Sequence, residues 1–221
     1  MKNFPDGTRE FVIGTTGSGK TFYTVRRTEN VPRMIAIDPK RTLKKDMEHD
    51  KLIDQDMGEL LRYLQANEGG HFRVIYMPTP GDEMYETHEI CRLLEIMQAP
   101  YRDEVPGAKK VMLIIEEAAQ SVPQPVSRDA RGALRIATMG REMGIDLMVV
   151  TQRPQSVDKT MREMFDGRIT CFQVVGDDAI GAAAKLMNAA KDAPGKIANL
   201  RQFEHVLYEN NEAKTQQPLK E

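Results

Sequence analysis

One segment of the chain has the residue types and the spacing that bind phosphate. It reads GTTGSGKT from Gly14 to Thr21, which is Gly, four residues, Gly, Lys and Thr, the pattern of a phosphate-binding loop, or P-loop. Glycines let the backbone curl so that several N–H groups point at phosphate oxygens, and the N-terminus of a following helix adds positive dipole. A Gly-rich turn that contains Lys-Thr by chance is the alternative, but the flanking residues read as a strand and a helix.

The cofactors expected at this segment are ATP and Mg²⁺. We expect Lys20 to reach the β- and γ-phosphates and the hydroxyl of Thr21 to bind the metal. The predicted nucleotide-binding residues are Gly14, Thr15, Thr16, Gly17, Ser18, Gly19, Lys20 and Thr21.

Two adjacent acids form a second group of residues that could do chemistry. Glu116 and Glu117 directly follow the apolar run VMLII. A buried strand that ends in two acids is costly unless they meet a cation or transfer a proton. We expect Glu116 to hold the Mg²⁺ shell, through water, and Glu117 to orient or deprotonate an attacking water. The two roles could be exchanged, and a strand that ends in an ordinary charged turn is the alternative.

A third polar group follows another apolar run. LMVV (147–150) leads into Thr151, Gln152, Arg153 and Pro154. A short Val-rich run predicts a buried strand, which a proline cannot continue. Taken alone, the polar residues fit an ordinary turn.

The elements that must position these groups alternate along the chain. Strands are predicted at 10–14, 33–39, 71–78, 109–117, 145–152, 167–175 and 203–209, and helices at 20–30, 57–67, 89–97, 129–143 and 179–190. Continuous apolar runs between helices favour an α/β fold with a mostly parallel central sheet flanked by helices. Ligands bind at the carboxyl ends of the strands in such sheets, and the three polar groups occupy those ends.

Composition limits the class of protein. We expect a single domain over residues 1–209 of the 221, and a polar, mobile tail at 210–221. No apolar run approaches the roughly 20 residues of a membrane span, and the N-terminal residues lack a signal-peptide core. Cys91 and Cys171 have no metal-ligand spacing and are expected to be buried thiols. A net charge of −2 gives no global attraction to nucleic acid, so any DNA contact must come from local patches or several subunits.

The order of the motifs resembles the FtsK–HerA superfamily of DNA-pumping ATPases. A P-loop strand, a strand ending in IDPK (37–40), a strand ending in paired acids and the segment GREMGIDLMVVTQRP (140–154) follow one another. The resemblance covers roughly residues 10–158 and implies a RecA-like P-loop NTPase fold. Some members have a His soon after the paired acids, where this chain has Ala118, Ala119 and Gln120. The shortness of the chain makes it most similar to the genome-packaging ATPases of tailless, membrane-containing icosahedral viruses.

This resemblance implies an ATP-driven double-stranded DNA translocase that works as a ring of identical subunits, with a hexamer as one possible size. Gln152 is expected to sense the γ-phosphate, and Arg141 to be the arginine finger that reaches the ATP of a neighbouring subunit. Arg131, Arg135 and Arg153 are rivals for that role. The implied partners are double-stranded DNA, further copies of the chain, and a capsid vertex or membrane-associated packaging proteins, in the host cytoplasm or the virion.

Several alternatives stay open. Arg128, Arg131 and Arg135 share a helix face by spacing and could form a solvated basic face. Asp38 could cap a turn, and KRTLKK (40–45) could contact the DNA backbone or only face solvent. A nucleoside kinase-like phosphotransferase, with APYRDEVPGAKK (99–110) as a lid, and a nucleotide-dependent switch protein are the competing functions. Residues 159–221 receive no chemical role.

Overall fold

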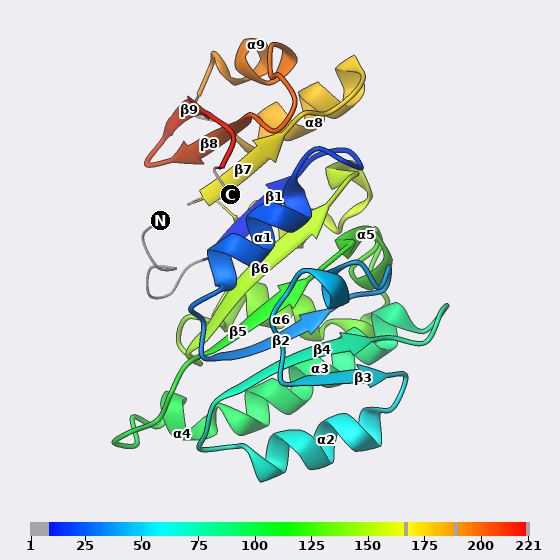
Figure 1. The fold of residues 1–221 in the computed structure, drawn as a ribbon, viewed down its shortest axis with the longest axis vertical. Coiled ribbons are helices and arrows are strands. Elements are labelled where there is room, and N and C mark those ends of the chain that lie inside the picture. The colour runs from blue at the N-terminus through cyan, green and yellow to red at the C-terminus, as the bar shows by residue number, and fades with distance from the viewer. Residues whose placement is uncertain (1–8, 166–167, 188–189, 220–221) are drawn as a thin grey trace.

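The computed structural model describes residues 9–165, 168–187 and 190–219 (Figure 1). Its strands are β1 (Arg9–Ile13), β2 (Arg33–Ile37), β3 (Lys51–Asp54), β4 (Phe72–Met77), β5 (Val111–Ile115), β6 (Ile145–Thr151), β7 (Arg168–Phe172), β8 (His205–Glu209) and β9 (Glu212–Gln216). Its α-helices are α1 (Lys20–Thr28), α2 (Met57–Ala66), α3 (Glu83–Met97), α4 (Ala99–Arg102), α5 (Ala118–Ser121), α6 (Gly132–Met139), α7 (Lys159–Glu163), α8 (Asp177–Leu186) and α9 (Ala193–Ala198).

The strands form one sheet in the order β3-β4-β2-β5-β6-β1-β7-β8-β9. Every pair from β3 to β7 is parallel, while β8 runs antiparallel to β7 and β9 antiparallel to β8. The predicted α/β class with a mostly parallel sheet is therefore confirmed. Strand β1 lies inside the sheet, between β6 and β7, and its fully apolar segment Phe11–Ile13 is completely buried.

The two faces of the sheet are covered unequally. Because side chains alternate along a strand, Phe11 and Ile13 pack into the larger core cluster with residues of α2, α3 and α6. Val12 faces the other way and belongs to the smaller cluster, which α1 covers with Tyr23. In Figure 1, α1 crosses the near face of the sheet. The helix that follows the P-loop segment is thus fixed against the central strands.

A buried polar network around Glu10 of β1 joins helix α1 to the neighbouring strand β7. Glu10 is fully buried, and its Oε1 accepts hydrogen bonds from the hydroxyls of Tyr23 (2.5 Å) and Thr170 (2.6 Å). Its Oε2 pairs with Arg27 Nη2 at 3.4 Å and Arg168 Nε at 3.1 Å. Burial and the charge of Glu10 raise the pKa of the Tyr23 hydroxyl. One carboxylate therefore connects β1, α1 and β7.

The structure differs from the sequence prediction at several elements. Strand β3 and helix α9 were not predicted, and the predicted mobile tail is wrong for Glu212–Gln216, which forms β9. Asn210 and Asn211 both have positive φ, 53° and 64°, as a two-residue hairpin turn requires. Residues in this turn return the chain onto β8, so the segment is part of the sheet.

The helix predicted at 129–143 is shorter than expected. A short 3₁₀ turn (Arg128–Ala130) precedes α6, and α6 ends at Met139. At Gly140 the chain turns so tightly that a Cβ would lie 2.5 Å from the Ile136 carbonyl oxygen and 2.9 Å from that of Ile145. The chain therefore leaves the helix at Gly140, before the predicted helix end at residue 143.

Some predictions fall partly outside the described residues. Residue 167 of the predicted strand 167–175, residues 188–189 of the predicted helix 179–190, and residues 1–8 and 220–221 of the predicted domain and tail are among them. The described parts of these two elements are β7 and α8. None of the helices in the described segments has the length and apolar character needed to cross a bilayer.

The Glu10 network predicts a large effect on stability. Glu10→Ala removes the carboxylate that Arg27 and Arg168 both face. Breaking such a buried pair should lower the free energy of unfolding by about 3–5 kcal/mol in urea denaturation. The control is Glu29→Ala, whose pair with Arg26 has side chains 45% and 39% exposed and should be worth about 0–1 kcal/mol. Equal stabilities of the two variants would contradict the role of Glu10.

Candidate functional site

The P-loop segment connects β1 to α1 at the carboxyl edge of the sheet. Gly14 N donates to Thr151 O (3.3 Å) and Thr15 N to Gln173 O (3.0 Å), so the loop is held by both neighbouring strands. A Cβ at Gly14 would lie 2.6 Å from Ser18 Oγ and 2.7 Å from Phe172 Cβ. Gly17 and Gly19 have φ of 75° and 106°, which glycine adopts readily. The segment has the tight curl that a phosphate cradle needs.

Lys20 folds back over this loop. It is 7% exposed, and its Nζ donates to Thr15 O at 2.8 Å. Burial lowers the pKa of Lys20, while the charges of Glu116 and Glu117 act in the opposite direction. A lysine that is buried among loop carbonyls and faces two acids is set to pair with an anion in the loop. The P-loop and the paired acids thus form one site.

The paired acids lie where β5 reaches the same edge. Glu116 N donates to Ile37 O at 2.9 Å, which continues the pairing with β2. Glu117 has φ 48° and ψ 53°, a left-handed backbone conformation that turns the chain sharply into α5. Both residues are buried, at 5% and 8% exposed. Burial raises the pKa of Glu116 to about 7, with Lys20 opposing it and Asp38 adding to it.

The residues present fit a bound magnesium nucleotide. Within the described part of the chain, Ser18 Oγ and Glu116 Oε2 are buried and have no hydrogen-bond partner. Buried polar atoms are normally paired, so these two mark positions for a ligand. Thr21 opens the helix directly after Lys20 and is partly exposed. Ser18 lies in the phosphate loop, and Thr21 with Glu116 are the residues that would hold Mg²⁺.

Gln152 links the P-loop to Glu117. Strand β6 lies beside β1, with Ile13 opposite Thr151. Thr16 Oγ1 donates to Gln152 Oε1 at 3.1 Å, and Gln152 Nε2 donates to Glu117 Oε2 at 3.2 Å. Gln152 therefore does more than form an ordinary turn, because its side chain bridges the P-loop and the predicted base.

Two further residues of the IDPK segment reach this region. Lys40 Nζ lies 2.7 Å from Glu117 Oε2, an ion pair that the sequence did not suggest. Asp38 is fully buried and caps a turn, because its Oδ2 accepts from Leu43 N (2.7 Å) and its Oδ1 from Thr42 Oγ1 (3.3 Å). These contacts match the expectation that Asp38 caps a turn.

The four candidate arginines occupy different places. Arg141 is exposed in the turn between α6 and β6, at the amino end of that strand. Seven residues of β6 separate the two edges, about 23 Å at 3.3 Å per residue. Arg135 pairs with Glu95 at 2.9 Å, and Arg131 is exposed at the start of α6. Arg153 is exposed directly after Gln152. Arg153, which directly follows Gln152, lies at the edge that carries the P-loop, whereas Arg141 lies at the opposite edge.

An apolar pocket that the sequence did not predict adjoins the P-loop. Its volume is about 280 Å³, and its lining residues are Gly19, Phe22, Phe172, Phe203, Pro218 and Leu219. A Cβ at Gly19 would lie 3.3 Å from Phe203 Cδ1 and 3.4 Å from Phe172 Cε1, so the rings abut the loop. Phe203 is 47% exposed and has φ 66°. The only sequence signal was an aromatic residue in a segment without an assigned role.

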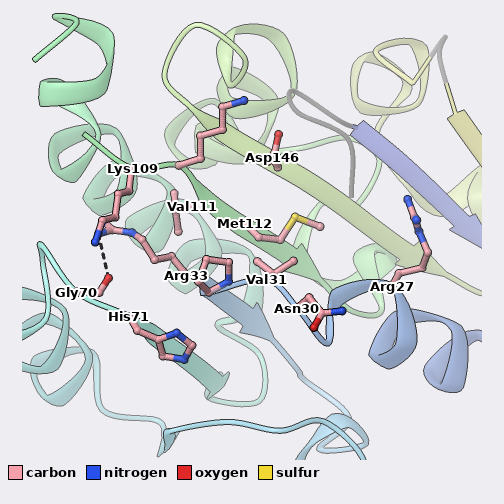
Figure 2. A pocket seen from close by; sticks show the side chains of 12 residues that line it. Arg27, Asn30, Val31, Arg33, Gly70, His71, Lys109, Val111, Met112 and Asp146 are labelled. Atoms are coloured by element: carbon pink, nitrogen blue, oxygen red, sulfur yellow. Dashed lines mark hydrogen bonds between the residues drawn. The ribbon is translucent and has the colours of Figure 1, made fainter. Parts of the chain in front are cut away.

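A larger pocket of about 390 Å³ lies elsewhere (Figure 2). Its lining includes Arg33, Val111 and Asp146, which stand at or near the first residues of β2, β5 and β6. Arg33 Nη1 donates to Gly70 O at 3.3 Å and to Glu68 O, which ties β2 to the loop before β4. This pocket is at the amino edge of the sheet, opposite the P-loop, and does not join the site.

Comparisons with known proteins identify the fold. No protein-family model and no curated protein matches the sequence. The genome packaging NTPase B204 from Sulfolobus turreted icosahedral virus 2, in complex with sulfate, has a TM-score of 0.71 at 18% identity over 99% of each chain. The same NTPase in complex with AMPPCP has a TM-score of 0.70 at 17% identity, covering 98% of this chain and 100% of its own. VirB4 of Thermoanaerobacter pseudethanolicus has a TM-score of 0.66 at 11% identity, over 96% and 89%. These likenesses show a shared fold and confirm the predicted P-loop NTPase architecture.

The raised pKa of Glu116 predicts how stability depends on pH. The folded protein holds this proton up to about pH 7, whereas the ordinary pKa is 4.5. The contribution of protonated Glu116 to the free energy of unfolding is therefore complete below pH 4.5 and is lost as the pH rises through about 7. Glu116→Gln cannot ionise, so it should lose less stability than the wild type over that range, by on the order of 2 kcal/mol. Urea denaturation at pH 5 and pH 8, in a chelator and without nucleotide, measures the difference. An equal loss of unfolding free energy between pH 5 and pH 8 in the two proteins would contradict the proposed effect of Glu116.

Proposed function

We propose that the chain is an ATPase that drives double-stranded DNA translocation, of the genome-packaging type, as a ring of identical subunits. One observation supports the proposal: the P-loop, Gln152 and Glu117 are joined by direct contacts at one edge of the sheet. The fold is shared, over almost the whole chain, with a packaging NTPase whose structure contains AMPPCP. The motif order shared with DNA-pumping ATPases agrees with both.

The hydrolytic roles follow from the geometry. The P-loop N–H groups and Lys20 bind the phosphates, and a bound Mg²⁺ would supply positive charge that stabilises the phosphates during hydrolysis. Thr21 and Glu116 would hold the metal. Glu117 accepts a proton from the water that attacks the γ-phosphorus, while the bond to the ADP oxygen breaks. Gln152 contacts both Thr16 and Glu117, so loss of the γ-phosphate changes the support of the base and of β6 together.

The apolar pocket beside Gly19 fits the nucleotide base. It opens directly next to the loop that binds the phosphates, and Phe22 and Phe203 offer exposed ring surface for stacking. None of the described residues that line it has a polar side chain. The base is therefore held through aromatic and apolar contact, with no side-chain hydrogen bond to read its edges.

Partner contacts are proposed from exposed basic residues and from the family resemblance. In the cluster 40–45, Lys44 and Lys45 are exposed, whereas Lys40 pairs with Glu117 and Arg41 with Asp54. Lys44 and Lys45 are the proposed contacts with the DNA backbone, whose binding depends on cations of this kind. Further copies of the chain complete the ring. A capsid vertex or membrane-associated packaging protein is the proposed docking partner.

The nucleoside-kinase alternative loses its expected lid. The segment 99–110 forms α4 and a loop that leads into the first residue of β5. It therefore lies at the amino edge of the sheet, near Arg33 and Gly69, and not over the P-loop. A switch protein without mechanical work is separated from a translocase by the assay below.

The first test measures ATP hydrolysis with and without linear double-stranded DNA. The wild type should hydrolyse ATP and be stimulated by DNA. Lys20→Ala should lose at least about 10²-fold in kcat/KM, because it removes a charged phosphate contact. Glu117→Gln should still bind ATP and Mg²⁺ but slow hydrolysis by about 10²–10⁴-fold, since it removes the base.

Each outcome separates the candidate functions. A slow rate that DNA does not change favours the switch, and phosphate transfer to a nucleoside favours the kinase. Loss of nucleotide binding in Glu117→Gln would move the metal role onto Glu117. Circular dichroism of each variant verifies that the fold is retained.

A second test concerns the arginine finger, for which we propose Arg141. Arg141→Ala should bind ATP nearly normally yet lose about 10³-fold or more in turnover, because a finger acts on the transition state. Mixing it with Lys20→Ala subunits should restore part of the activity, since a mixed interface can pair an intact P-loop with an intact finger. Arg153→Ala is the matched variant at the other edge of the sheet. Mixtures that co-assemble but never exceed either parent would overturn the trans role of Arg141.

A further inference from the structure

We infer that Lys40 is a positioning residue for Glu117, a role that rests on the proposed ATPase function. Lys40 Nζ lies 2.7 Å from Glu117 Oε2. The side chain of Glu117 is 10% exposed and that of Lys40 is 36% exposed. Ion pairs on an open surface contribute little to stability, but in this pair the carboxylate of Glu117 is nearly buried. Lys40 is therefore placed to hold the carboxylate of Glu117 in one position.

The backbone around Lys40 is fixed by its own contacts. Strand β2 lies beside β5 with Ile37 opposite Ile115, so the two strands leave the sheet side by side. Asp38 N donates to Tyr76 O at 2.8 Å, and the Asp38 carboxylate caps the following turn. Arg41 has φ 58° and forms a two-point ion pair with Asp54 at 3.1 and 2.7 Å. Lys40 is held between these two anchored residues, directly beside the exit of β5.

Both partners of Glu117 bind the same carboxylate oxygen. Gln152 Nε2 donates to Oε2 at 3.2 Å, and Lys40 Nζ pairs with Oε2 at 2.7 Å. The left-handed backbone at Glu117 sets the direction from which the side chain approaches. With Oε2 held from two strands, Oε1 is the oxygen that can accept a hydrogen bond from water. The pair thus orients the base for one proton transfer.

The chemical step needs no proton from Lys40. A water oxygen bonds to the γ-phosphorus as the bond from phosphorus to the ADP oxygen breaks, and one water proton passes to Glu117 Oε1. Lys40 keeps its three protons and fixes Oε2. Correct placement of a reacting group within about 1 Å can change a rate by about 10²-fold. A brake that holds Glu117 inactive until DNA binds is the opposing explanation, and it predicts a rate change of the opposite sign.

The test compares Lys40→Met and Lys40→Arg with Lys51→Met in DNA-free ATP hydrolysis. Lys51 is a matched control, because its Nζ pairs with Glu59 at 2.6 Å and its side chain is 38% exposed. Lys40→Met should lower kcat by about 10–100-fold and change the KM for ATP less than twofold. Lys40→Arg should recover at least part of the rate, and Lys51→Met should match the wild type.

A second arm excludes a general structural effect. In the Glu117→Gln background, Lys40→Met should cause no further loss of kcat, because residues that act as a unit are not additive. An unchanged or increased kcat for Lys40→Met would overturn the positioning role, and so would a full additional loss in the Glu117→Gln background. Absence of ATP hydrolysis by the wild type would overturn the proposed function itself, and with it this role.

Discussion

The hydrogen bonding of β1 on both sides is the constraint on which the site depends. Strand β1 pairs in parallel with β6 and with β7, so Ile13 is level with both Thr151 and Cys171. This register puts the start of the P-loop next to Gln152 on one side and Gln173 on the other. A shift of one residue would move Thr16 by about 3.3 Å and turn every β1 side chain to the opposite face. The contact between Thr16 and Gln152 could not survive it.

The two ends of β1 are connected through α1. Glu10, near its amino end, binds Tyr23 of α1 inside the protein. The Tyr23 ring packs edge-on against the rings of Phe172 and His205, with centroid distances of 5.5 Å and 5.4 Å. Phe172 in turn lines the pocket beside Gly19. The aromatic contacts that stabilise α1 and β8 therefore also shape the wall of the proposed base pocket, so the antiparallel end of the sheet belongs to the site.

Local patterns in the sequence predicted the parts of the site that depend on few residues. The P-loop spacing, the acids after an apolar run and the polar end of β6 are each encoded within about ten residues, and the α/β alternation implied that they would meet. Lys40 and Phe203 could not be found this way. The role of Lys40 depends on the order of the strands, and that of Phe203 on a contact with Gly19, which is far away in the sequence. The pairing of Lys40 with Glu117 requires β2 beside β5. Strand β9 was missed because Glu212–Gln216 is polar and pairs with β8 alone.

The positions of the arginines limit how a ring could be assembled. The P-loop, the acids and Gln152 occupy the carboxyl edge of the sheet, and Arg141 occupies the amino edge. A finger at Arg141 must therefore bring the amino edge of one subunit to the carboxyl edge of the next. Such a contact joins two different surfaces, and repeated contacts of this kind form a ring when the rotation between subunits closes. Arg153 lies on the same edge as the P-loop, so a finger there would reach the next nucleotide from the carboxyl edge of its own subunit. The proposed ring is thus consistent with a finger at Arg141.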